Sequence, residues 1–422
     1  MKTQLHRNVN REYPVPEEVI GNMLRKLSKG GMDKHLTDVN KLKSIMKGYT
    51  LDKVKGCIFG GAIGDALGYT VEFDGYRFIV ARFGEKGITR FYGSPYSPLG
   101  GVSDDTQMTL FTATGLLEGS SRVKLEGDKD LRAWEKAVTR HYLDWKNTQV
   151  MTKGPKAEHP SSWLYLVPEL HERRAPGNTC MSALISLEAG HPVSNNSKGC
   201  GGVMRVAPVA LCRDLMDMPA SFVTTLGGTV AEVTHQHPLG FMPAALMTDL
   251  LRRIMDSECG NDKESLKSYV LAAADTVRGL YGHMYPEHWI VLKNLVDKAV
   301  ELADADLNDV DAIGQLGEGW VGDEALAIAI YCALKHYDSF EDAVVAAVNH
   351  NGDSDSTGAI CGNILGLVYG YEALPSHFKD QVELADIMTE VAEDLWNGCP
   401  SADADPELLN EWKRKYLLMD KT

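Results

Sequence analysis

The stretch that decides the fold is "HNGDSDSTGAICGNILGLVYG", residues 350–370, in which an apolar run carries a glycine at every fourth position. Far earlier in the chain, "GCIFGGAIGDALGYTVEF", residues 56–73, has the same spacing. Each glycine inside a helix costs about 1 kcal/mol relative to alanine, so two such stripes need a reason. We expect two helices that pack with their bare backbones in close contact. Chance spacing in a chain with 40 glycines is the alternative.

Two acidic pairs stand at the starts of predicted helices. Asp353 and Asp355 precede the second glycine-spaced helix, and Asp104 and Asp105 follow Ser103 in "SDDTQM". Capping alone explains one such site, because serine and acidic residues favour the first turn of a helix. Two sites that met would bring four carboxylates together, and their repulsion would raise their pKa values. A divalent cation removes that conflict, and carboxylate and hydroxyl ligands favour Mg²⁺, Mn²⁺ or Ca²⁺ over zinc.

A calcium loop of the EF-hand type is the rival interpretation of the second acidic pair. Asp353 and Asp355 imitate the first and third ligands of that loop, but its twelfth position falls on Ile364, where a bidentate glutamate is required. We therefore expect the metal to lie between segments that are distant in the sequence.

Two further segments carry polar groups with a possible role. Asp65 lies within the first glycine stripe and is expected to bond to backbone, whereas Glu72 follows the helix end and is the better reactive carboxylate. The stretch "SKGCGGVMRVAP", residues 197–208, predicts a glycine-rich loop that offers backbone N–H groups to phosphate or hydroxyl groups. It lacks the spacing of a nucleotide-triphosphate loop.

Composition limits the class of protein. The chain has 422 residues, 44% of them apolar, and a formal net charge of −15, which argues against nucleic acid as a main partner. There is no secretory signal and no apolar run near the roughly 18 residues of a membrane span, so we expect a cytoplasmic protein. The eight cysteines form no C-x-x-C pair and are expected to be reduced.

The pattern along the chain is helical. Residues 1–50 are basic, with ten Lys and Arg against five Asp and Glu, and are interpreted as an N-terminal extension to a helical domain at 51–422. Helical periodicity is strongest in thirteen segments, and the nearest approach to a strand is "RFIVARF", residues 77–83. The loops 84–104, 147–178 and 190–205 are long enough to suggest function. The thirteen segments are 51–68, 105–118, 130–146, 179–189, 206–215, 221–236, 241–256, 263–279, 287–303, 322–336, 339–349, 358–371 and 379–396.

The motifs together resemble the ADP-ribosylglycohydrolase family. The matching stretches are "GCIFGGAIGDALGYTVEF", "SDDTQM", "APGNTC", "GCGGVMR", "THQHP", "GEGWVGDEALA" and "HNGDSDSTGAICG", which cover roughly residues 51–370. The first, second and last are specific in combination. The resemblance implies an all-α orthogonal bundle of more than ten helices with a cleft that holds two divalent cations, Mg²⁺ or Mn²⁺.

The resemblance also implies roles for individual residues. Glu72 and Asp105 are the candidate catalytic carboxylates. A helix-end or interior histidine remains the alternative for His235, and a plain core residue for Met204. The implied metal ligands are Ser103, Asp104, Asp105, Asp353, Asp355 and Ser356, and the implied substrate-binding residues are Gly199, Gly201, Gly202, Met204 and His235.

Departures from the family pattern concern the loop and the linkage. Cys200 stands where family loops commonly carry asparagine, and Ser103 and Ser356 replace threonines. No acidic residue directly precedes Gly177, where some arginine-specific members carry one, so the catalytic base and the preferred linkage stay open.

The implied activity is hydrolysis of the glycosidic bond between ADP-ribose and a modified protein, with ADP-ribosyl-arginine as the expected linkage. An alternative is that residues 1–50 bind an ADP-ribosyltransferase and neutralise it, as a toxin-immunity protein would. A third interpretation is a family member that binds metal without catalysis. The expected partner is an ADP-ribosylated protein, with neither nucleic acid nor membrane involved.

Overall fold

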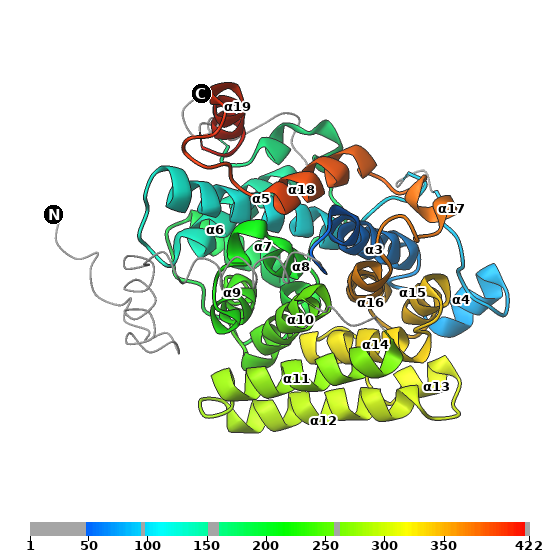
Figure 1. Ribbon diagram of the computed structural model, residues 1–422. Coiled ribbons are helices and arrows are strands. Elements are labelled where there is room, and N and C mark those ends of the chain that lie inside the picture. The colour runs from blue at the N-terminus through cyan, green and yellow to red at the C-terminus, as the bar shows by residue number, and fades with distance from the viewer. Residues whose placement is uncertain (1–47, 94–97, 151–159, 257–261, 418–422) are drawn as a thin grey trace.

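The structure, a computed structural model, describes residues 48–93, 98–150, 160–256 and 262–417 (Figure 1). These ranges contain seventeen α-helices, four 3₁₀ helices and no strand, only an isolated bridge between Gly199 and Val321. The all-α prediction and the expectation of more than ten helices are confirmed. Almost all of the basic extension, residues 1–47, lies outside the described residues, so its predicted role stays a prediction.

The helix bounds follow the labels of Figure 1, which begin at α3. The α-helices are α3 (Leu51–Tyr69), α4 (Tyr76–Phe83), α5 (Asp104–Leu125), α6 (Ala133–Thr148), α7 (Asn178–Glu188), α8 (Ala207–Leu211), α9 (Ala220–Glu232), α10 (Pro238–Asp256), α11 (Lys263–Tyr281), α12 (Pro286–Ala303), α13 (Asp309–Ile313), α14 (Gly322–Lys335), α15 (Phe340–Val348), α16 (Ser354–Tyr369), α17 (Ser376–Lys379), α18 (Ala385–Asn397) and α19 (Pro406–Tyr416). The 3₁₀ helices are η1 (Trp163–Leu166), η2 (Pro168–Leu170), η3 (Cys200–Gly202) and η4 (Arg213–Leu215).

Helices α3 and α16 lie against each other through their glycine stripes, as the spacing predicts. A Cβ atom added at Gly60 would overlap the carbonyl oxygen of Gly362, and one added at Gly64 would overlap that of Gly358. The glycines pair in reverse order along the two helices, so the helices are antiparallel. The last contact joins Gly68 to the first turn of α16, where the carbonyl of Ser354 occupies the place of a side chain.

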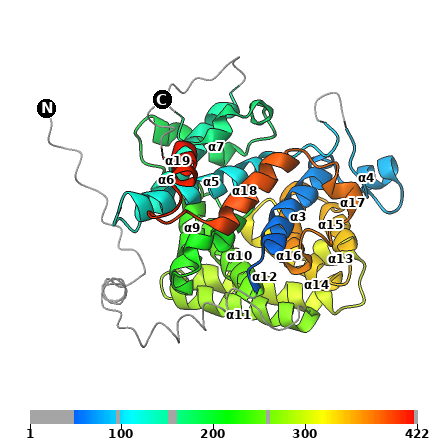
Figure 2. The same ribbon diagram turned by 45° about the horizontal axis from the view of Figure 1, so that its top comes forward.

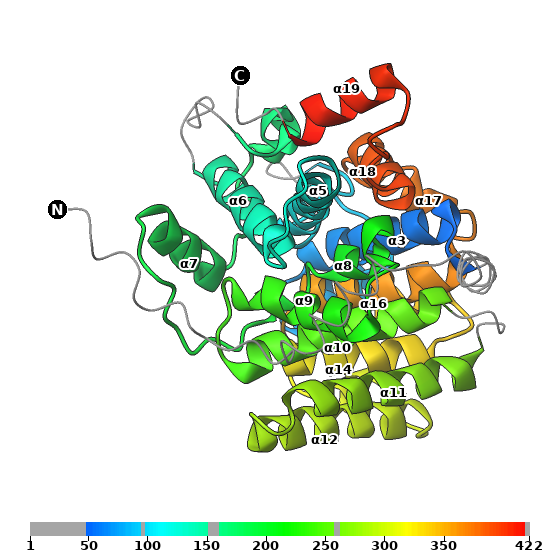
Figure 3. The same ribbon diagram turned by 60° about the vertical axis from the view of Figure 1, so that its left-hand side comes forward.

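The central pair is covered on both sides by further helices. Helix α18 packs on α3, and α14 packs on α16 with α12 beyond it, which gives the layers seen in Figures 2 and 3. Helices α5, α6 and α10 complete the core, which is continuous through the described residues. The first turns of α5 and α16 and the end of α3 all lie inside this core, because the residues at each of them are buried.

Some helix predictions were wrong in their details. Residues 77–83, the nearest approach to a strand, lie within helix α4, which ends where Gly84 adopts a φ of 96°. Only Ile79 of that helix is buried, so the apparent alternation reflects an exposed surface helix. Helix α16 begins four residues before the predicted start, because the Asp353 side chain caps it. Besides α4, the helices α13, α17 and α19 were not predicted.

No helix in the described ranges is long and apolar enough to cross a membrane.

Replacing Gly362 by alanine should destabilise the protein by about 3 kcal/mol or more, because its Cβ would meet backbone that cannot move aside. Gly279, in helix α11, is the matched control, since a Cβ there meets nothing within 4 Å. Gly279→Ala should be neutral or stabilise the protein by up to about 1 kcal/mol. Denaturant unfolding of both variants checks this, and equal stabilities would contradict the close-packing interpretation.

Candidate functional site

The first turn of α16 presents three polar side chains at the point where α3 ends. The Asp353 carboxylate caps the helix by accepting from the Ser356 amide, 3.4 Å away, and the Asp355 carboxylate accepts from the same amide at 3.0 Å. All three side chains are at most 3% exposed. The glycine contact therefore places the acidic start of α16 in the interior of the protein.

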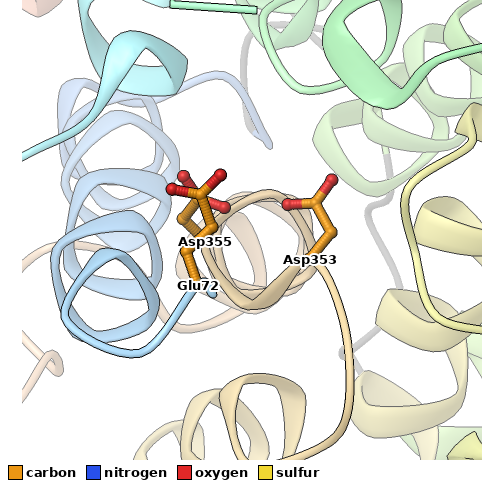
Figure 4. Close-up of side chains that lie close together, drawn as sticks. All are labelled: Glu72, Asp353 and Asp355. Carbon is orange, nitrogen blue, oxygen red and sulfur yellow. The ribbon is translucent and has the colours of Figure 1, made fainter. Parts of the chain in front are cut away.

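Glu72 joins these carboxylates from the chain that leaves α3. One carboxylate oxygen from each of Glu72, Asp353 and Asp355 lies within 4.8 Å of the others, close enough to hold a metal ion (Figure 4). Glu72 is only 9% exposed, and its Oε2 atom is buried without a hydrogen-bond partner. The structure thus brings the candidate catalytic carboxylate to the predicted metal ligands of α16.

Helix α5 brings the second acidic pair to the same place. Ser103 caps it by accepting from the Asp105 amide at 3.2 Å, while the Asp104 carboxylate accepts from the Gly177 amide at 3.1 Å. Asp105 points an unpartnered, buried Oδ2 atom into the protein. Both Asp104 and Asp105 interact electrostatically with Asp355, so the two acidic helix starts face each other.

Asp65 fixes this helix start, as its position in the glycine stripe predicts. Its carboxylate accepts from the Ser103 amide at 3.0 and 3.1 Å and from the Thr106 amide at 3.0 Å. The side chain is fully buried. Asp65 therefore ties α5 to α3 and is a positioning residue.

Burial and mutual repulsion disfavour the ionised form of these carboxyls. Burial, followed by the charge of Asp355, raises the pKa of Glu72 to about 10 and that of Asp65 to about 7. Burial first, and then the carboxylate of Asp355, also raises the pKa well above its ordinary range in Asp104, Asp105 and Asp353.

The cluster fits a hard divalent cation. It combines several carboxylates with the hydroxyls of Ser103 and Ser356, and two of its buried carboxylate oxygens have no hydrogen-bond partner. A soft donor beside it is the Cys200 thiol. Burial and the carboxylates of Asp353 and Asp105 raise the pKa of that thiol well above its ordinary value, so it stays protonated and binds metal weakly.

The glycine-rich loop forms the neighbouring wall of the site. Met204 lies 3.8 Å from the Ser356 hydroxyl, measured from its sulfur, which connects the loop to the start of α16. His235 lies behind the loop, because a Cβ at Gly199 or Gly201 would meet its ring at 3.2 or 2.9 Å. Gly202 packs against the backbone of α10. The five predicted substrate-binding residues therefore gather in one place.

His235 is a buried, neutral histidine. Its ring Nδ1 lies 2.9 Å from the Thr234 hydroxyl, and the side chain is 2% exposed. Burial, followed by the charge of Arg205, lowers its pKa to about 3. These features match the alternative of an interior histidine that supports the loop, while a contact with substrate stays a prediction.

Two residues of the site, Arg205 and Arg174, were not predicted from the sequence. Arg205 is fully buried behind the loop, where it donates to the Thr234 hydroxyl at 2.7 Å and to the Cys180 sulfur at 3.3 Å. Arg174 supplies the carbonyl that accepts from the Asp104 amide at 2.9 Å. The arginine inside "GCGGVMR" and the unusual length of the loop 147–178 were the available signals.

The metal-free protein should gain stability when Asp105 is replaced by asparagine. A raised carboxyl pKa contributes stability that is present at low pH and is lost as the pH rises toward the folded-state pKa, about 7 for Asp65 and about 10 for Glu72. In EDTA at pH 8, we expect Asp105→Asn to raise Tm by roughly 5 °C. The gain should shrink at pH 5.5, because the free-energy cost of a raised carboxyl pKa grows with each pH unit above the unfolded-state pKa of about 4.

Asp275→Asn, at an exposed position of α11, is the control for that measurement. Adding MgCl₂ at pH 8 should raise the Tm of the wild type and of this control more than that of Asp105→Asn. A lower Tm for Asp105→Asn in EDTA at pH 8 would show that the carboxylates do not repel one another in the folded protein.

The chain is similar to known proteins of one family. The model of the family described as ADP-ribosylglycohydrolase matches residues 46–405. An uncharacterised protein of Archaeoglobus fulgidus is 27% identical over 82% of this chain and 96% of its own length. The ADP-ribosylarginine hydrolase Tri1 of Serratia proteamaculans is 24% identical over 84% of this chain and 81% of its own.

A solved structure titled ADP-ribosylglycohydrolase-related protein complex has the same fold. Its TM-score is 0.56 at 24% identity, over 82% of this chain and 98% of that one. Since the family model matches well over half of the residues, this chain belongs to the ADP-ribosylglycohydrolase family.

Proposed function

We propose that this protein is a metal-dependent hydrolase that releases ADP-ribose from modified arginine side chains of proteins. The observation that carries the proposal is the buried cluster in which Glu72 meets Asp353 and Asp355 at the start of α16, with the Asp104 and Asp105 carboxyls of α5 near enough to interact with Asp355 electrostatically. A relative named as an ADP-ribosylarginine hydrolase, similar over 84% of this chain, supports arginine as the acceptor.

The proposed metal ligands are the side chains that face one another at the two helix starts. Two cations, Mg²⁺ or Mn²⁺, would be held by Ser103, Asp104, Asp105, Asp353, Asp355 and Ser356. When bound, the cations would offset the repulsion among the carboxylates, orient the ribose hydroxyls and polarise water. The Asp65 and Gly177 bonds hold the α5 ligands in place, since they fix Ser103 and Asp104.

Glu72 is the proposed catalytic base. Its Oε2 atom has no hydrogen-bond partner among the described residues. With cations offsetting the neighbouring charges, the raised pKa of Glu72 would fall, and the carboxylate would accept a proton from the water that attacks the anomeric carbon and return it to the departing guanidine nitrogen. Asp105 also has a buried oxygen without a hydrogen-bond partner among the described residues and would orient the same water. Both negative charges favour the electron-poor, oxocarbenium-like transition state of glycoside hydrolysis.

The diphosphate of the substrate would lie on the glycine-rich loop. Backbone N–H groups at Gly201 and Gly202 are donors without a side chain to obstruct them. The buried Arg205 guanidinium lies behind this loop, and a thiol, a hydroxyl and the Val230 carbonyl accept its hydrogen bonds, so its positive charge favours an anion. A chain of net charge −15 needs such a local donor set.

Asp355→Asn should abolish release of ADP-ribose from an ADP-ribosyl-arginine peptide, with a loss of more than about a hundredfold in kcat. Glu72→Gln should lower kcat to a similar extent while the protein still binds ADP-ribose. Release is measured by chromatography with MgCl₂, with MnCl₂ and with EDTA, beside peptides that carry serine-linked ADP-ribose and beside O-acetyl-ADP-ribose.

Asp309→Asn is the matched control, because this carboxylate bonds to Tyr331 and His336 near α13 and takes no part in the cluster. It should keep wild-type activity. Full activity of Asp355→Asn, or activity that is unchanged by EDTA, would refute the proposed mechanism. Cleavage of the serine or O-acetyl linkage alone would refute arginine as the acceptor.

A further inference from the structure

Two large aromatic side chains are exposed beside the carboxylate cluster. Phe73 is 77% exposed and Trp320 is 40% exposed. Their rings are nearly parallel, with centroids 6.1 Å apart and an angle of 17° between the planes. Two exposed aromatic rings do not contribute the stability that burying them would give. We therefore expect the pair to bind a ligand.

Both rings belong to segments that form the site. Phe73 directly follows Glu72, one of the three clustered carboxylates. On the other side, the Asp353 amide donates to the Glu318 carbonyl at 2.8 Å, two residues before Trp320. The Cys200 amide of the glycine-rich loop donates to the carbonyl of Trp320 itself at 3.3 Å. The aromatic pair therefore spans the solvent side of the site, from the candidate base to the loop.

The segment that carries Trp320 is held rigidly against α16. Gly319 has a φ of 83°, and a Cβ there would meet the Thr357 side chain at 2.9 Å and the Asp353 Cβ at 3.4 Å. Gly352, with a φ of 124°, packs on the backbone of Glu318. The position of the tryptophan is thus set by the same helix start that presents the metal ligands.

The two exposed aromatic rings favour a planar cation as ligand. Aromatic faces attract cations through their negative quadrupole, and guanidinium groups stack on them in preference to other charged groups. A serine hydroxyl or an acetyl group carries no positive charge with which to bind these aromatic faces.

We propose that Phe73 and Trp320 form an acceptor subsite that stacks on the guanidinium group of the ADP-ribosylated arginine. This inference rests on the proposed function and adds the side chains that select the linkage. ADP-ribose itself occupies the metal site and the glycine-rich loop, whereas the aromatic pair contacts only the acceptor side of the bond that breaks.

The test is the variant Phe73→Ala/Trp320→Ala. We expect KM for an ADP-ribosyl-arginine peptide to rise about tenfold or more, with kcat changed much less. The Kd for ADP-ribose, measured by calorimetry with MgCl₂, should stay unchanged because this ligand lacks the acceptor. The conservative variant Phe73→Tyr/Trp320→Phe should restore KM, which a purely structural role of the two side chains does not require.

Two matched controls are available on other helices of the protein. Phe78 in α4 is 73% exposed and Trp396 in α18 is 37% exposed, and neither belongs to the segments of the site. The variant Phe78→Ala/Trp396→Ala should keep the wild-type KM for the arginine peptide. An equal rise in KM for both double variants would overturn the inference.

Two other outcomes separate the inference from the proposed function. An unchanged KM in Phe73→Ala/Trp320→Ala, or an equal loss of ADP-ribose binding, overturns the acceptor subsite while arginine-specific hydrolysis stands. If the wild type cleaves no ADP-ribosyl-arginine, the proposed function fails. Equilibrium binding then decides, since the inference requires the wild type to bind ADP-ribosyl-arginine more tightly than ADP-ribose, and the double variant to lose that difference.

Discussion

The contact on which the structure depends is the one between the backbones of α3 and α16. Where side chains separate two helices, small rotamer changes let the helices shift; here glycine faces carbonyl, and no rotamer can adjust. The contact ends where Gly68 meets Ser354 and Asp355, so the backbone itself sets the distance between the end of α3 and the acidic start of α16. The same contact fixes the position of Glu72, which follows the end of α3.

The rigid contact keeps the carboxylates of the cluster close together despite their repulsion. The carboxylates of the cluster are buried, they repel one another, and two of their oxygens lack partners, so the metal-free site works against folding. A flexible scaffold would relieve the repulsion by letting the helix starts move apart. The glycine contact and the bonds from Asp65 to Ser103 and Thr106 prevent this. The site is therefore preorganised for positive charge before any ligand binds.

The sequence carried enough information for the local features and for the pairing of α3 with α16. Periodic glycines predict close backbone contact, and a hydroxyl or acidic residue before a helix predicts a cap, as Ser103 and Asp353 show. Features that depend on the tertiary structure had no such signal. The strand-like run in α4 is an exposed helix, and the contact between Asp104 and Gly177 joins segments whose spacing has no period. The stacking of Phe73 on Trp320 belongs to the same class.

The two walls of the site resolve an apparent conflict between a net charge of −15 and the proposed substrate, which carries a diphosphate group. One wall concentrates carboxylates, which suit cations and an electron-poor sugar. The other has no acidic side chain in its loop 199–204, and behind it lie the neutral His235 and the buried charge of Arg205. Because both walls meet where Met204 contacts Ser356, opposite potentials adjoin within one site. These two potentials would orient a ligand whose sugar end and phosphate end differ in charge. The net charge of the protein alone cannot orient such a ligand.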